Sequence, residues 1–107
     1  MQYINSNDIL IIKEVIKLFT QNDYYILESI LDKSDEDKGM IKTKGTTKKE
    51  IIDKTKLSLS KVTLTLGILE SHGYIEVGLK VKNAKSYIVS EKGIEELLKM
   101  KGMYKDE

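Results

Sequence analysis

The chain has 107 residues, which fits one domain, and its 40% hydrophobic and 33% charged residues are typical of a globular protein. Cysteine is absent and His72 is the only histidine, so disulfides are excluded and neither a Ser-His-Asp triad nor a multi-histidine metal site can be assembled. We therefore expect no enzyme, no cofactor and no metal. No apolar run is long enough to span a membrane and residues 1–7 lack signal-peptide features, so we expect a cytoplasmic protein.

The net charge is only +1, but it is unevenly distributed along the chain. Residues 1–37 contain three lysines and eight acidic residues, whereas residues 42–61 contain seven lysines and two acidic residues. Residues 78–92 are again basic, with four lysines and one acidic residue. This asymmetry favours a polyanionic partner on one face, and the alternative is a solvated, lysine-rich surface.

The first predicted helix begins after Ser6 or Asn7 and runs to about Thr20. Apolar side chains cover most of its circumference, so it must be buried in a core or against a partner chain. Because so small a domain has few ways to bury both sides of a helix, we favour a dimer contact. The residues expected in this contact are Ile9, Ile12 and Ile16.

Asp23 can cap a second helix from Tyr24 to about Asp32, which has one apolar face. Residues 33–39 form a polar loop whose acidic residues lack the ligand spacing of a calcium site. Residues 40–44 are expected to form a short edge strand.

Thr47 and Glu50 form a capping box, in which each side chain can bond the other residue's backbone N–H. This pattern predicts a helix from there to about Lys56. Leu57 and Ser58 then make a turn, and Ser58 can cap a further helix.

This further helix is expected from Leu59 to about His72, and Gly73 lies where a positive φ often ends a helix. The spacing of its apolar residues predicts one core-facing stripe. That stripe consists of Val62, Leu66 and Leu69.

After Gly73 the hydrophobic period changes from 3.6 to 2, which predicts a strand with Ile75, Val77 and Leu79 on one side. Residues 80–85 are polar and turn-like, and residues 86–89 return as a second strand, so we expect a hairpin with a basic tip. A last helix begins near Ser90, with Ile94, Leu97 and Leu98 as its apolar residues.

Helix, tight turn, helix and hairpin is the order of a winged helix-turn-helix. The sequence therefore predicts one domain over residues 1–107, of α+β class and mainly α, with flanking N- and C-terminal helices. Both basic segments coincide with elements that contact duplex DNA in this fold, since the second helix fits the major groove and a basic hairpin can follow the backbone.

We expect phosphate contacts from Lys48, Lys49, Lys61, Lys80, Lys82 and Lys85. We expect base or groove contacts from Ser58, Ser60, Lys61 and Thr63. All basic residues are lysine, so no bidentate arginine–guanine contact is available and readout should depend on backbone contacts and groove shape.

Residues 46–98 resemble the DNA-binding core of MarR-type regulators. The resemblance is carried by short motifs, and the Asp-x-Arg signature of the MarR wing is missing. These motifs are Glu50-Ile51-Ile52, Leu57-Ser58, Ser60-Lys61-Val62-Thr63, Leu69-Glu70-Ser71-His72-Gly73-Tyr74-Ile75 and Val89-Ser90-Glu91-Lys92-Gly93.

The chain more closely resembles the TubR-type centromere-binding proteins of plasmid and phage partition systems, which are of about this length. The resemblance implies a homodimer on repeated DNA sites that passes this DNA to a tubulin-like GTPase, TubZ. It also implies that the paired recognition helices form much of the dimer contact.

Leu64 and Ile68 give an independent indication of that geometry. At about 100° per residue they lie on the far side of the helix from Val62, Leu66 and Leu69, which suggests a contact with protein. In the alternative interpretations, Leu64 touches thymine methyl groups or another helix of the same chain covers both residues.

We therefore expect a centromere-binding partition adaptor that also represses its own operon. The alternative within the same class is a MarR-like transcriptional regulator. The alternative from another class is a winged helix that serves only as a protein-interaction module.

Overall fold

The computed structural model describes residues 20–104 and has a winged-helix fold of α+β class. The helix expected over residues 7–20 lies almost wholly outside the described residues, as do Ile9, Ile12 and Ile16. The described elements are α2 (Gln21–Ser29), the 3-10 helix η1 (Lys42–Lys44), β1 (Thr46–Thr47), α3 (Lys48–Thr55), α4 (Leu59–Ser71), β2 (Ile75–Val77), β3 (Ser86–Val89) and α5 (Glu91–Tyr104).

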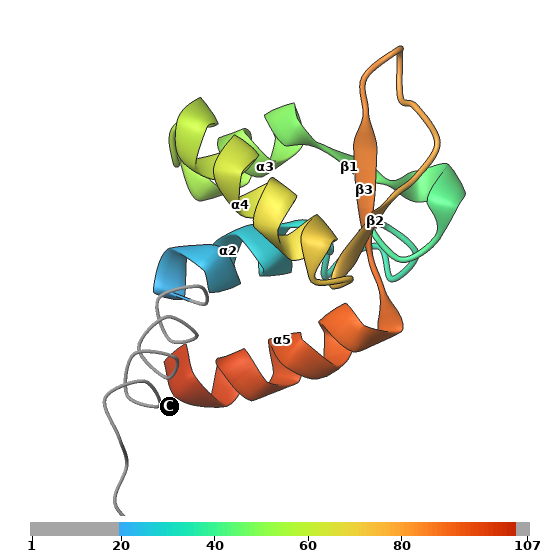
Figure 1. Ribbon diagram of the computed structural model, residues 1–107. Coiled ribbons are helices and arrows are strands. Elements are labelled where there is room, and N and C mark those ends of the chain that lie inside the picture. Colours follow the sequence, from blue (N-terminus) through green and yellow to red (C-terminus); the bar gives the residue numbers. More distant parts are fainter. Residues whose placement is uncertain (1–19, 105–107) are drawn as a thin grey trace, which may run out of the picture.

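Helix α2 lies at the centre of the fold, where it packs against α3 and α4 and also against α5 (Figure 1). The side chains between these helices and the sheet form one apolar core. Its fully buried members include Tyr24, Ile26, Leu27, Ile30, Ile51, Val62 and Leu69. The predicted core stripe of α4 is confirmed, because Val62, Leu66 and Leu69 are all buried.

The predicted start of α2 was wrong, because Thr20 and not Asp23 is its N-cap. The Thr20 hydroxyl accepts a hydrogen bond from the Asp23 N–H at 3.3 Å, and the Asp23 carboxylate accepts one from the Thr20 N–H at 3.0 Å. This capping box begins the helix at Gln21 and gives Asp23 a place in its first turn. The helix also ends earlier than expected, at Ser29.

The helix-turn-helix follows the sequence prediction closely. Thr47 and Glu50 form the expected capping box, and Lys56 ends α3 with a left-handed φ of 61°. Ser58 caps α4, where its hydroxyl accepts a hydrogen bond from the Lys61 N–H at 3.1 Å. Gly73 follows α4 with the expected positive φ, 77°.

The sheet is antiparallel with strand order β1-β3-β2. The expected edge strand over residues 40–44 was wrong, because the Lys44 N–H bonds the Ile41 carbonyl and closes a 3-10 turn there. The strand that joins the sheet is Thr46–Thr47, which pairs with Ser86 and Tyr87.

The predicted alternation in β2 holds only at its start. Ile75 is buried, but Val77 and Leu79 are 38% and 57% exposed. Val77 is the last residue of β2 and pairs with Tyr87. Beyond it the Gly78 N–H still bonds the Ser86 carbonyl, whereas the Leu79 N–H bonds the Lys42 carbonyl, so the chain turns there from β3 toward η1. Leu98, expected on the apolar face of α5, is 66% exposed as well.

Candidate nucleic-acid interface

A groove lies between the N-terminal end of α3 and the hairpin, with a volume of about 580 Å³. We call it the α3–wing groove, and the wing is the segment from residue 78 to residue 86. The groove brings together two lysines of α3 and two of the wing that are more than thirty positions apart in the sequence. Its lining residues are Lys38, Thr47, Lys48, Lys49, Glu50, Val81, Lys82, Ala84, Lys85 and Tyr87.

The wing owes its shape to a tight turn at its tip. Val81 and Ala84 exchange two backbone hydrogen bonds, at 2.9 and 2.8 Å, and Lys82 and Asn83 between them have φ values of 49° and 69°. Two successive left-handed residues are typical of a two-residue hairpin turn. The turn makes Lys82 part of the tip and leaves its side chain exposed.

Four of the five lysines that line this groove have no carboxylate partner among the described residues, the exception being Lys38. Lys49, Lys82 and Lys85 are exposed and Lys48 is half-buried, and none of the four forms an ion pair there. The Lys85 ammonium lies 5.6 Å from the centre of the Tyr87 ring, a cation–π distance. Their positive charge is therefore not neutralised within the described part of the chain.

Glu50 is the only acidic residue that lines the groove in the described part of the chain, and its carboxylate is already used. It accepts a hydrogen bond from the Thr47 N–H at 3.0 Å and pairs with the Lys38 ammonium at 3.0 Å. Partial burial alone would raise the pKa of the Glu50 carboxyl, but the Thr47 backbone hydrogen bond and Lys38 outweigh it and hold that pKa below its ordinary value. The groove is thus positive overall, and the dipole of α3 adds to this.

The start of α4 presents hydroxyl groups to solvent. Ser58, Ser60 and Thr63, which the sequence analysis expects to contact the DNA groove, are exposed. Lys80 is exposed too, but it does not line the α3–wing groove.

Lys61 differs from the other candidate lysines because it is bound within the protein. Its ammonium pairs with the Asp23 carboxylate at 3.0 Å, and Asp23 is only 3% exposed. The Thr65 hydroxyl donates to the same carboxylate oxygen at 3.1 Å. With the Thr20 N–H on its other oxygen, the buried carboxylate has three donors and fixes α4 against α2.

Sequence reasoning missed this role of Asp23. A residue before an apolar run looks like an N-cap, and nothing local shows that its carboxylate is covered by another helix. A weak signal was available, since Lys61 and Thr65 are four positions apart on α4 and therefore point to the same side.

The far side of α4 carries exposed apolar residues. Leu64 is 62% exposed and Ile68 is half-buried. Leu59, which sequence reasoning left out, is 61% exposed as well, but at the first turn of α4 and on the side of the core stripe. No helix of the described part covers Leu64, so that alternative is excluded for this residue within residues 20–104. The Leu64 side chain is therefore available to a partner or to DNA.

Residues 20–104 hold no group of three or more histidine or acidic side chains placed to bind a metal ion. Among the described helices, none has the length and apolarity required to cross a membrane.

Comparison with known proteins gives no match to a protein-family model and no match to a characterised sequence. Solved structures do match. A DNA-binding fragment of TubR from Clostridium botulinum is 25% identical, with a TM-score of 0.57 over 76% of this chain and 95% of the fragment. A TubR of type III plasmid segregation is 20% identical, with a TM-score of 0.58 over 94% and 93%.

MepR, a transcription regulator of the Staphylococcus aureus multidrug efflux pump MepA, is 15% identical. Its TM-score is 0.63 over 97% of this chain and 78% of MepR. These likenesses confirm the predicted winged-helix fold and the resemblance to TubR-type and MarR-type proteins.

Proposed function

We propose that the chain binds duplex DNA in the cytoplasm, as a homodimer and without catalysing a reaction. The observation that carries the proposal is the α3–wing groove, where Lys48, Lys49, Lys82 and Lys85 converge without carboxylate partners in the described part. Separate lysines that converge on one groove suit the regularly spaced phosphates of a DNA backbone. The TubR fragment of similar structure, which is DNA-binding, supports the same function.

In this proposal Lys48, Lys49, Lys82 and Lys85 bind phosphates, and Lys80 adds a further contact. The exposed hydroxyls of Ser58, Ser60 and Thr63 lie at the start of α4 and meet the base edges. Lys61 contributes by holding α4 in place through Asp23, because moving it to a phosphate would leave a buried carboxylate without its cation. Specificity then depends mainly on groove shape and on repeated or paired sites.

The homodimer is proposed to form through the far side of α4. Leu64 and Ile68 meet their counterparts across a two-fold axis, and the exposure of Leu64 supports this. Such a contact presents the two α4 N-termini together, which matches the arrangement that the TubR resemblance implies.

The biological role proposed is that of a partition adaptor. The chain would bind repeated centromere sites, link them to a tubulin-like GTPase of the TubZ type and repress its own operon. The likeness to two TubR structures supports this role. The second candidate is a MarR-like transcriptional regulator, which the likeness to MepR favours.

Footprinting on the DNA that flanks the gene of this protein tests the proposal. A cluster of repeated protected sites supports the partition role, and a single palindrome supports the transcriptional regulator. If the chain binds no DNA even at low salt, the proposal is wrong and a protein-interaction module becomes the better interpretation.

A further inference from the structure

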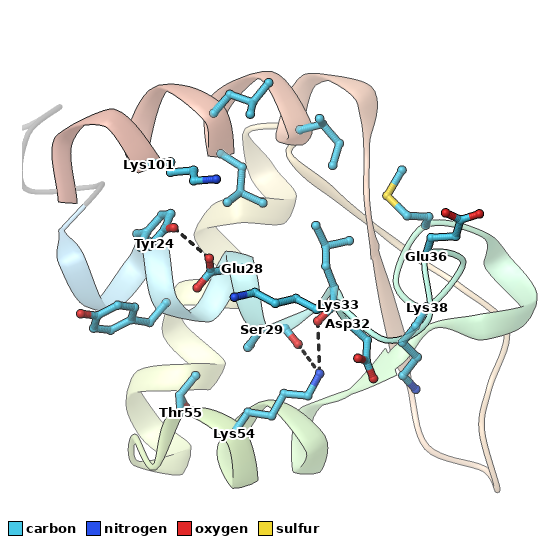
Figure 2. A pocket seen from close by; sticks show the side chains of 16 residues that line it. Tyr24, Glu28, Ser29, Asp32, Lys33, Glu36, Lys38, Lys54, Thr55 and Lys101 are labelled. Atoms are coloured by element: carbon cyan, nitrogen blue, oxygen red, sulfur yellow. Dashed lines mark hydrogen bonds between the residues drawn. The ribbon is translucent and has the colours of Figure 1, made fainter. Parts of the chain in front are cut away.

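Four leucines of the described part are largely exposed, and they lie in three regions of the molecule. Leu98, on α5, lines a second groove of about 960 Å³ between α2 and α5 (Figure 2). Leu79 follows β2 at the base of the wing, and Leu59 and Leu64 belong to α4. Only Leu59 stands in the first turn of α4, the part of this helix that we propose to meet the bases.

The start of α4 presents Leu59 together with Thr63. Leu59 is 61% exposed and directly follows the cap residue Ser58, whose hydroxyl accepts a hydrogen bond from the Lys61 N–H at 3.1 Å. Thr63 is exposed as well, and residues four positions apart lie on the same side of a helix. Leu59 and Thr63 therefore share one side of this turn, beside the exposed hydroxyl of Ser58.

The core of the domain does not account for Leu59. Val62, Leu66 and Leu69 form the buried stripe of α4, and each is at most 2% exposed. Leu59 lies on the side of that stripe but nearer the N-terminus of the helix, where the core has ended. The start of α4 and the tip of the wing both lie on the side of the molecule away from α5 (Figure 1). Leu59 is therefore exposed at the end of α4 that shares this side with the wing.

The chemistry of the major groove offers one group that suits an exposed leucine. The base edges there carry hydrogen-bond donors and acceptors, and the C5-methyl of thymine is the one methyl group among them. Serine and threonine hydroxyls both donate and accept, so those at the start of α4 discriminate weakly between bases. Lys61 is paired with Asp23, and the chain has no arginine. Leu59 is therefore the side chain at the start of α4 whose chemistry selects one base.

We infer that Leu59 contacts the C5-methyl group of a thymine in the major groove, with the Thr63 side chain beside it. This inference rests on the proposed function and adds to it one base-specific contact, so that sites with thymine at this position are preferred. It assigns to Leu59 the thymine contact that the sequence leaves open for Leu64, and Leu64 keeps its place in the proposed dimer. In a homodimer each half-site then contains one such thymine.

Deoxyuridine tests this contact, because it pairs like thymidine and lacks only the C5-methyl group. The site found by footprinting is synthesised with thymine and again with deoxyuridine at every thymine position, and binding is measured by titration at one salt concentration. The unmodified chain should bind the thymine site more tightly by about fourfold for each methyl group contacted, or about fifteenfold for a dimer, because burying one such group is worth about this factor.

Two variants of Leu59 should lose this preference. Leu59→Ala should bind both DNAs with nearly equal affinity, since it removes the apolar side chain that the methyl group meets. Leu59→Asn keeps the branched shape of leucine but is polar, so it should lose the preference too, and it replaces the alanine variant if that variant does not fold. Leu98→Ala is the matched control, because Leu98 is 66% exposed on α5, and it should keep the full preference. Circular dichroism confirms folding of each variant.

The outcomes separate this inference from the proposed function. Equal binding of thymine and deoxyuridine DNA by the unmodified chain would overturn the inference and leave the proposed function standing. A preference that persists undiminished in the Leu59 variants would also overturn it, because another residue or the stiffness of the DNA would then be its source. Failure of the unmodified chain to bind either DNA at low salt would refute the proposed function, and the inference would fall with it.

Discussion

The α3–wing groove and the start of α4 are both basic in sequence, but their lysines differ in whether they are paired with a carboxylate. In the groove, Lys48, Lys49, Lys82 and Lys85 have no carboxylate partner in the described part, whereas Lys61 on α4 is paired with the buried Asp23. The far side of α4 adds an exposed leucine, Leu64, rather than a charge. The fold therefore leaves the four groove lysines unpaired but not Lys61, and we expect the former to contribute more charge to the proposed DNA contact.

Leu64→Glu should have the largest effect, because it tests whether α4 is a protein contact. Burying a leucine is worth about 1.5–3 kcal/mol, and Leu64 enters the proposed dimer twice, so we expect dimerisation to weaken by about 3–6 kcal/mol. Sedimentation at matched concentrations measures this, and circular dichroism confirms folding. Lys99→Glu, at an exposed residue of α5, is the control, and equal dimerisation of both variants would remove Leu64 from the dimer contact.

Lys61→Met should lower the free energy of unfolding by about 3 kcal/mol, because it leaves the buried Asp23 carboxylate without its cation. Urea denaturation measures this change. Lys80→Met, at an exposed lysine, should change stability by less than about 0.5 kcal/mol. If the two variants have the same free energy of unfolding, the ion pair between Lys61 and Asp23 does not stabilise the fold.

Replacing Lys82 and Lys85 together by alanine should weaken DNA binding by about 1–3 kcal/mol, on specific and non-specific DNA alike. The reason is that phosphate contacts carry little sequence information. Titration at fixed salt measures the loss, with Lys99→Ala on α5 as the matched control. Unchanged affinity of the double variant would exclude the wing from the interface.

Glu50→Gln should have the smallest effect, a few-fold increase in DNA affinity, because it removes the one acidic side chain of the described groove lining and an amide oxygen can still cap Thr47. The pKa of Glu50 is lowered in the folded chain, so its carboxylate stabilises the fold above its ordinary value of 4.5. That contribution is lost as the pH falls through the lower folded pKa. The free energy of unfolding should therefore fall less steeply with decreasing pH for Glu50→Gln than for the unmodified chain. An identical pH dependence of the two below the ordinary pKa of Glu50 would contradict this.

The sequence predicted the features that depend on neighbouring residues. The capping box at Thr47, the α4 cap at Ser58 and the buried stripe of α4 were all confirmed because each is a local pattern. The strand expected over residues 40–44 was wrong because pairing of Thr46 with Tyr87 is a contact across the chain.

The sequence named four of the lysines that line the groove, but it left out Lys38 and did not show what surrounds any of them. Composition and element order indicated which lysines belong to α3, α4 and the wing. Only the fold shows that Asp23, nearly forty positions away, covers one of them, and that α3 and the wing form one groove. Pairing at such a distance leaves no periodic signal in a single sequence.

The salt dependence of DNA binding tests the central claim most directly. Each phosphate contact contributes about 0.9 to the magnitude of the slope of log K against log salt, so replacing Lys48, Lys49, Lys82 and Lys85 by glutamine should reduce that magnitude by about 3.6 for each copy of the chain, or about 7.2 for the proposed dimer. Lys61→Met should leave the slope nearly unchanged, since its ammonium is already paired within the protein. A slope that is unaffected by the four replacements but falls with Lys61→Met would contradict the account.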